Sequence, residues 1–215
     1  MGRYDNITGK TVDKIWHFIH SVTEEGEHDI LYKFSKINSR QLKFKLKVDI
    51  ASKAEWIATE PFLLDGAAAP SLKLPTIEIS VLLSKGAGKA YYNKLNACLN
   101  EIVRHEIEHL TQWGINRKGR KPHVSESGRD RVSERLKPAY GYFSLADEIP
   151  ALVHGMHRQA KIEKRPITYI FTEYLDQYIA EDQINERQAK LLFNKWYNYS
   201  IKNLPRAKYA ECKYR

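Results

Sequence analysis

The residues best equipped to do chemistry form one pattern, His-Glu-Ile-Glu-His at 105–109. Positions four apart lie on one face of a helix, so His105 and His109 can offer two imidazole nitrogens to one metal ion. Glu106 lies about 100° around the helix from His105, close enough to accept a proton from water beside the metal without being a ligand. Two ligands and a base are the start of a zinc hydrolase site, which still needs a third ligand from elsewhere.

The apolar pattern around this segment predicts that these polar residues are buried. Apolar residues recur at spacings of three and four, and continuing the pattern leads to Glu106 and His109, with His105 beside them. The apolar residues of this stripe are Leu95, Cys98, Leu99, Ile102, Val103, Leu110 and Trp113. Burying the three polar groups without partners would cost several kcal/mol, and a metal ion would remove that cost. A surface helix with solvated His and Glu side chains is the alternative.

A carboxylate in 138–161 is our candidate for the third ligand. This segment predicts a helix with Ser144 as N-cap and with Asp147 and Glu148 in the first turn, where Pro150 is tolerated. We choose Glu148, whose alternative role is to stabilise the helix N-terminus. Asp147 could instead hydrogen-bond a ligand imidazole. His154 and His157 would be ligands only in an all-histidine site.

The H-E-x-x-H helix and the later Asp-Glu-Ile-Pro-Ala segment, with tyrosines just ahead of it, resemble the gluzincin branch of the zincin metallopeptidases. The resemblance covers about Ile77 to Gln159. It implies Zn²⁺ as cofactor, His105, His109 and Glu148 as zinc ligands, and Glu106 as the general base that activates water to hydrolyse peptide bonds. The arrangement and the segment Tyr-Ser-Ile-Lys-Asn-Leu-Pro at 199–205 also resemble small uncharacterised proteins encoded by tailed bacteriophages.

The chain departs from these patterns at several positions. Leu152 stands where gluzincins often carry an Asp, and Gln112 and Ile115 exclude the metzincin ligand set. The developing oxyanion of an amide hydrolysis needs a donor besides the metal, for which Tyr142 or Tyr140 is our candidate, with His154 and His157 behind them. Packing of either tyrosine against the core is the alternative.

The first half of the chain predicts a helix and two strands ahead of the metal-binding helix. Thr11–Glu24 has helical spacing, and apolar residues alternate with lysines at 42–50, as in a half-exposed strand. Glu60–Pro75 contains Asp-Gly and three prolines and is interpreted as an irregular connection. Thr76–Leu83 is the second strand, and we expect it to form a sheet edge to which an extended peptide substrate could pair. The metal-binding helix then begins near Lys89.

The second half predicts a loop and further helices. Ile115–Lys137 is polar and basic and is typical of a lid or of a solvated insertion, in which His123 is a minor candidate ligand or proton donor. Ile167–Ile179 and Gln183–Lys202 are amphipathic helices expected to pack on the zinc-bearing helices. The basic tail Lys202–Arg215 is interpreted as a frayed terminus, with nucleic-acid contact as the alternative.

Composition indicates a globular protein and gives an expectation for its cellular compartment. The 215 residues are 42% hydrophobic and 28% charged, with a net charge of +9 and two cysteines far apart, so we expect a folded domain without a disulfide framework. There is no signal-like start and no apolar run long enough for a membrane span. We expect a cytoplasmic protein, in the host cytoplasm if a phage encodes it, with no membrane partner.

These observations predict an α+β, zincin-like fold in a single domain, 1–215. It would comprise an N-terminal helix and a small antiparallel or mixed sheet (1–88), the zinc-site helices with the basic loop 115–137 (89–161), and a helical extension with a basic tail (162–215). The expected function is a zinc-dependent metallopeptidase acting on a peptide or protein substrate, with weak nucleic-acid association through its basic surface. The alternatives are a zinc amidase acting on a non-protein or cell-wall peptide substrate, and a nucleic-acid- or virion-associated binding protein with a structural zinc.

Overall fold

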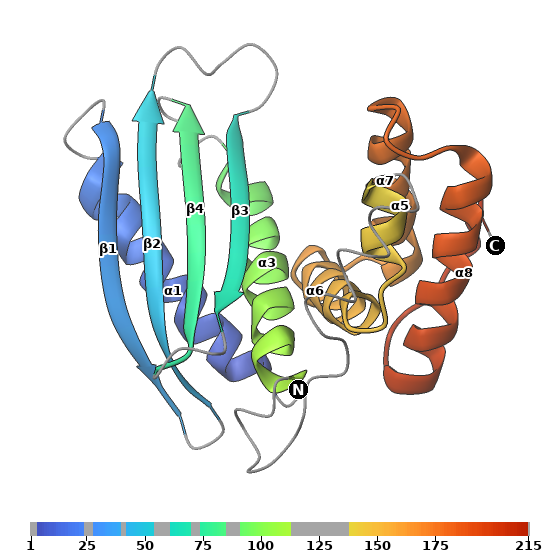
Figure 1. Ribbon diagram of the computed structural model, residues 1–215, viewed down its shortest axis with the longest axis horizontal. Coiled ribbons are helices and arrows are strands. Elements are labelled where there is room, and N and C mark those ends of the chain that lie inside the picture. Colours follow the sequence, from blue (N-terminus) through green and yellow to red (C-terminus); the bar gives the residue numbers. More distant parts are fainter. Residues whose placement is uncertain are drawn as a thin grey trace. The chain divides into compact units, whose positions relative to one another are not determined.

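The computed structural model describes residues 4–23, 28–39, 42–53, 61–69, 74–84, 91–112 and 138–214. The chain divides into two compact units, Met1–Arg120 and Lys121–Arg215, which are described one at a time. The first combines helices with a four-stranded mixed sheet and the second is helical, so the fold is α+β (Figure 1). Our expectation that all 215 residues act as one domain stays a prediction.

The N-terminal unit is a mixed sheet with helices on one face (Figure 1). Its strands are β1 (His28–Asn38), β2 (Lys43–Lys53), β3 (Phe62–Ala69) and β4 (Thr76–Ser84), in the order β1-β2-β4-β3. Strand β2 pairs antiparallel with β1 and parallel with β4, and β3 pairs antiparallel with β4. The alternation in β2 buries Phe44, Leu46 and Val48 under helices α1 (Asp5–Thr23) and α3 (Tyr92–Gln112), as expected for a strand with one covered face.

Two expectations about this sheet were wrong. Strand β3 lies within the segment that we interpreted as an irregular connection, because its small residues and its Asp65-Gly66 pair resemble a turn. Its pairing with β4, from Phe62 opposite Leu83 to Ala69 opposite Thr76, makes it a strand despite this composition. Strand β4 is therefore an inner strand, and β3 is the end strand of the described sheet.

The C-terminal unit is a group of helices around an aromatic core. Its elements are α5 (Pro138–Phe143), α6 (Glu148–Glu163), α7 (Ile167–Ala180) and α8 (Glu186–Asn203). Phe171, Phe193 and Trp196 are fully buried, and the rings of Phe171 and Trp196 make an edge contact at 5.7 Å between centroids. The expected helices in this region are confirmed, with α7 and α8 packing on α6. Helix α6 begins later than we expected: its N-cap is Asp147, whereas Ser144 lies in the turn after α5.

The segment after α8 packs against α7, so our interpretation of a frayed tail was wrong. The Thr168 hydroxyl donates to the carbonyl of Ala210 at 3.1 Å and accepts from the amide of Ala210 at 3.0 Å. Leu204 and Tyr214 are buried in the aromatic core. Apolar side chains and this double hydrogen bond hold a segment that its charge alone would leave in solvent. Among the helices described, none has the length and apolar character needed to cross a bilayer.

Candidate metal centre

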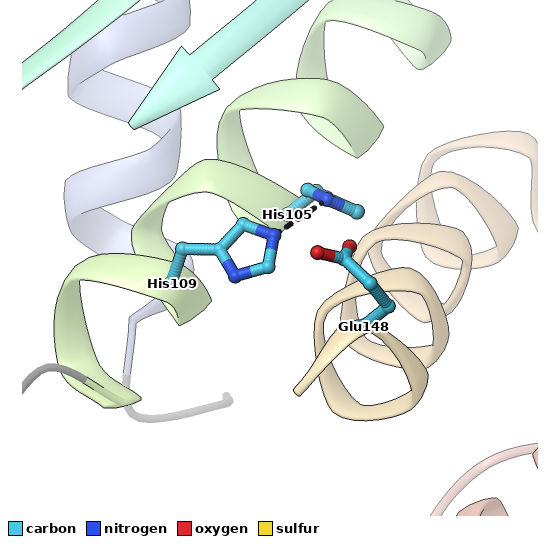
Figure 2. A group of neighbouring side chains, drawn as sticks. All are labelled: His105, His109 and Glu148. Atoms are coloured by element: carbon cyan, nitrogen blue, oxygen red, sulfur yellow. Dashed lines mark hydrogen bonds between the residues drawn. The ribbon is translucent and has the colours of Figure 1, made fainter. Parts of the chain in front are cut away.

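Helix α3 carries two buried imidazoles whose Nε2 atoms face each other. His105 and His109 are each 7% exposed, and their Nε2 atoms lie 3.0 Å apart (Figure 2). The rings make an edge contact at 72°, with 4.7 Å between centroids. Two zinc-bound nitrogens at about 2.0–2.1 Å from the metal in a tetrahedral site would be separated by about 3.3 Å. The observed separation is close to that value, so both nitrogens can bind one ion with little adjustment.

Gln112 orients the second imidazole. Its side-chain oxygen lies 3.1 Å from Nδ1 of His109. Because an amide oxygen only accepts hydrogen bonds, this contact favours the His109 tautomer with its proton on Nδ1, in which the lone pair on Nε2 is available to a metal. A hydrogen bond of this kind from the distal nitrogen usually fixes the orientation of a metal-binding histidine. We did not predict this role for Gln112, although its position three residues after His109, on the same face of the helix, indicates it.

Glu106 is buried beside the imidazole of His105 and against β3. It is 4% exposed, and its Oε1 atom lies 3.8 Å from Nε2 of His105. A Cβ atom added to Gly66 of β3 would come within 3.2 Å of Cγ of Glu106 and 2.8 Å of Cγ1 of Ile102. Only a glycine permits this close approach of strand to helix. Strand β3 therefore packs against the side chain that we expect to act as base, a contact that the sequence did not predict.

The third expected ligand, Glu148, opens helix α6 and is fully buried. Within the described part of the chain, His105, His109 and Glu148 form the group that could hold a metal ion, with their ligand atoms all within 4.8 Å of one another (Figure 2). Two imidazoles and one carboxylate are a donor set that suits zinc. Asp147, the N-cap, is also buried.

Three further charged residues of α3 lie close in sequence to the two imidazoles. Burial raises the pKa of Glu101, one turn before His105, to about 7, an effect that His105 opposes and Glu106 adds to. Arg104 and Glu108 form an ion pair at 2.8 Å along the helix, and both are largely buried. The second Glu of the His-Glu-Ile-Glu-His pattern is therefore engaged away from the imidazoles, which leaves Glu106 as the base candidate.

The remaining expected site residues have other surroundings. Tyr142 is exposed and Tyr140 is half-buried against the aromatic core, 6.0 Å from Nζ of Lys195 to the ring centre; a role for either in oxyanion binding stays a prediction. His154 Nε2 lies 3.4 Å from the hydroxyl of Tyr199, and His157 lines a cavity described below. His123 and the loop 115–137 lie outside the described residues.

Comparisons with protein-family models, curated proteins and solved structures were also made, and none of these matches the chain.

Proposed function

We propose that the chain is a zinc-dependent metallopeptidase with a zincin-like fold, in which His105, His109 and Glu148 bind the metal and Glu106 is the general base. The observation that carries this proposal is the pair of buried Nε2 atoms 3.0 Å apart, with the Glu106 carboxylate beside them. The mixed sheet packed against the H-E-x-x-H helix supports it as well.

Each residue has a distinct part in the proposed reaction. A zinc ion held by His105, His109 and Glu148 would supply the Lewis acidity needed to activate water and to polarise the scissile carbonyl. Glu106 accepts the proton of the attacking water and passes it to the leaving amine. Gln112 keeps the Nδ1 proton on His109, so that its Nε2 stays a ligand.

The position of β3 favours a peptide as the substrate. It is the end strand of the described sheet, and its Gly66 lies against Glu106. An extended peptide can add to such an edge through main-chain hydrogen bonds. A peptide aligned along β3 would present its amide groups close to the base, which is what hydrolysis of a peptide bond requires.

Metal content and peptide cleavage of four variants test the proposal. Glu106→Gln should keep one zinc per chain and lose turnover by orders of magnitude, whereas His109→Ala should lose both. Glu148→Ala should lower zinc affinity and turnover. Glu108→Gln is the matched control, because Glu108 pairs with Arg104 and should leave zinc content and turnover near those of the wild type. Intact zinc binding and activity in Glu148→Ala would overturn the ligand assignment, and loss of zinc in Glu106→Gln would make that residue structural. An amidase acting on cell-wall peptides would use the same residues but cleave that substrate and leave a peptide library intact.

A second candidate, nucleic-acid binding with a structural metal, is favoured by the uncovered face of the sheet. Tyr32 and Phe34 of β1 are 58% and 52% exposed, and Nζ of Lys45 lies 4.3 Å from the ring centre of Phe34. Exposed aromatic rings beside lysines are suited to stacking on single-stranded bases. Salt-sensitive DNA binding that survives chelation and Glu106→Gln, but is lost in Phe34→Ala, would support this function. Chelator-sensitive cleavage of a peptide library would support the peptidase.

A further inference from the structure

A cavity of about 210 Å³ lies in the C-terminal unit, where the end of α6, the start of α7 and the segment after α8 come together. None of its eight lining residues is acidic, and five are cationic: Lys161, Lys164, Arg165, Arg206 and Lys208. Ala160 and Ile167, both buried, form its apolar part. The cavity is thus a concave surface with a small apolar floor and with positive side chains from the end of α6, from the turn before α7 and from the segment after α8.

Main-chain contacts hold the cationic residues in place. Lys164 ends α6 in the left-handed region, with φ of 57°, and the Lys164 and Arg165 amides both donate to the carbonyl of Ala160. Lys208 is fixed from the other side, because its carbonyl accepts from the amide of Ile167 at 2.9 Å. The fold therefore fixes the main chain from which Lys164, Arg165 and Lys208 extend.

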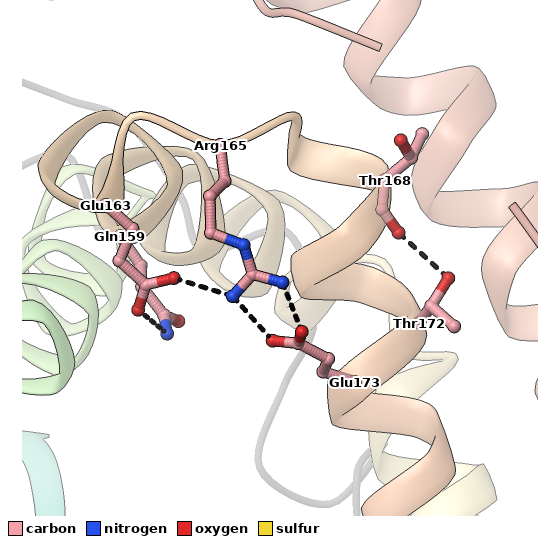
Figure 3. Close-up of polar contacts among 6 residues, drawn as sticks. All are labelled: Gln159, Glu163, Arg165, Thr168, Thr172 and Glu173. Carbon is pink, nitrogen blue, oxygen red and sulfur yellow. Dashed lines mark hydrogen bonds and ion pairs between the residues drawn. The ribbon is translucent and has the colours of Figure 1, made fainter. Parts of the chain in front are cut away.

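One of the five cations already has carboxylate partners. Arg165 donates to Glu163 at 3.0 Å and to both carboxylate oxygens of Glu173, one of them at 3.0 Å (Figure 3). These bonds, foremost the one to Glu173, raise the pKa of Arg165.

Three other cations of the cavity differ from Arg165 in their ion pairing. Within the residues described, Lys164, Arg206 and Lys208 form no ion pair. Like charges gathered without counter-charges repel one another, so the cluster disfavours the empty state and favours a bound anion.

The start of α7 adds to the positive potential. This helix of 14 residues has Pro166 as its N-cap, which supplies no side-chain hydrogen bond to the helix. The N-terminal end of a helix carries a partial positive charge and favours anions. Ile167, the first residue of α7, lines the cavity, so the positive end of the helix lies at its wall.

We propose that this cavity binds a phosphoryl group, carried either by a small phosphoester or by a nucleic-acid backbone. A phosphoryl group accepts hydrogen bonds through several oxygens and can bear two negative charges, which matches a cluster of Lys and Arg donors. The volume is below the range of about 300–1,000 Å³ typical of sites for drug-sized ligands, so the bound part is small. The floor formed by Ala160 and Ile167 contacts the carbon part of the ligand. This site is separate from the proposed zinc chemistry and does not depend on it.

Titration of the full chain with pyrophosphate and with glycerol phosphate, followed by calorimetry at about 50 mM salt, tests the proposal. We expect saturable binding that weakens as salt is raised, because the attraction is electrostatic. Lys208→Gln and Arg206→Gln should each lower the affinity about tenfold, the loss expected for one charge-assisted hydrogen bond. Lys164→Gln provides an independent variant at the α6 end. Lys190→Gln, an exposed lysine of α8 outside the cavity, is the matched control and should bind like the wild type.

A short single-stranded oligonucleotide distinguishes the two sources of the phosphoryl group. Oligonucleotide binding that pyrophosphate displaces and that Lys208→Gln weakens assigns the cavity to a nucleic-acid backbone. Binding of the small phosphates without such oligonucleotide binding assigns it to a phosphoester. The proposal is overturned if none of the three probes binds saturably, or if folded Lys208→Gln, Arg206→Gln and Lys164→Gln variants bind them as well as Lys190→Gln does.

Discussion

Replacing Gly66 by alanine should strain the contact between β3 and α3 on which the proposed position of the base depends. The new Cβ would lie 2.8 Å from Cγ1 and 3.0 Å from Cδ1 of Ile102, and 3.2 Å from Cγ of Glu106. Optimal carbon–carbon contacts are about 3.5–4.0 Å, so the closest pair is at least about 0.7 Å too near. Because a β-branched side chain in a helix strongly prefers one χ1 rotamer, Ile102 cannot simply rotate away, and the strand must move from the helix.

The expected loss of stability follows from two opposing effects. Overpacking of a well-packed contact costs about 1–3 kcal/mol. Replacing glycine by alanine also restricts the unfolded chain, which stabilises the folded state by about 0.4–1 kcal/mol. We therefore expect Gly66→Ala to lower the unfolding free energy of the N-terminal unit by about 1–2 kcal/mol, measured by urea denaturation of the full chain with circular dichroism.

A double-mutant cycle identifies the contact responsible. Ile102→Ala removes both carbon atoms that the new methyl group would meet, so Gly66→Ala should cost at least about 1 kcal/mol less in that background. Ala67→Val is the control, because it enlarges the next residue of β3 on the exposed face and should change stability by no more than about 0.5 kcal/mol. Additive costs in the cycle, or a Gly66→Ala variant as stable as the wild type, would refute the reasoning.

Three further predictions concern single side chains. Gln112→Ala should weaken zinc binding about 10–100-fold in a chelator competition, and Gln112→Glu should retain most of the affinity, because a carboxylate also accepts from Nδ1 of His109. The pKa of Glu101 is about 7 in the folded protein and near its ordinary value of 4.5 in the unfolded chain, so the folded state binds this proton more tightly. The unfolding free energy of the chelated protein should therefore fall as the pH rises from about 4.5 to about 7. Glu101→Gln should remove that fall in urea titrations at a series of pH values. Thr168→Val removes the hydroxyl that exchanges two hydrogen bonds with Ala210, so it should lower the unfolding free energy by about 1–3 kcal/mol and speed proteolysis of the C-terminal segment. An unchanged rate of cleavage would indicate that these bonds do not hold the segment.

The parts of the fold that could be predicted are those with a strong internal period. The alternation at 42–50 and the helical spacing of 167–179 each bury one face, and β2 and α7 follow them. Strand β3 has no comparable pattern: three alanines and a glycine follow two leucines, and only pairing with β4 makes it a strand. The order of strands is also a tertiary property, which is why β4 was wrongly expected at the edge. The basic tail was misjudged for a related reason, because Thr168 lies far from it in the chain.

For the candidate site, local spacing was informative wherever a single helix sets the geometry. His105 and His109 face each other because they are one turn apart, and Gln112 reaches His109 for the same reason. Gly66 could not be identified in this way, since its importance depends on how closely β3 approaches α3. The roles of Tyr140 and Tyr142 depend on where a substrate lies, which neither their spacing nor their packing defines.

The source of stability in the N-terminal unit bears on the role of the proposed metal. Leu95, Leu99 and Val103 are fully buried in a core that includes both helices and the inner strands of the sheet, so the N-terminal unit has a source of stability other than a metal. In a small zinc module the metal supplies the folding free energy, and its ligands are usually all protein side chains. A unit already held by its core does not need a closed set of four protein ligands. The proposed set of His105, His109 and Glu148 has three ligands from the described residues, which is the number that leaves a position for water and substrate. The size of the core and this three-ligand set therefore support the proposed catalytic role of the metal.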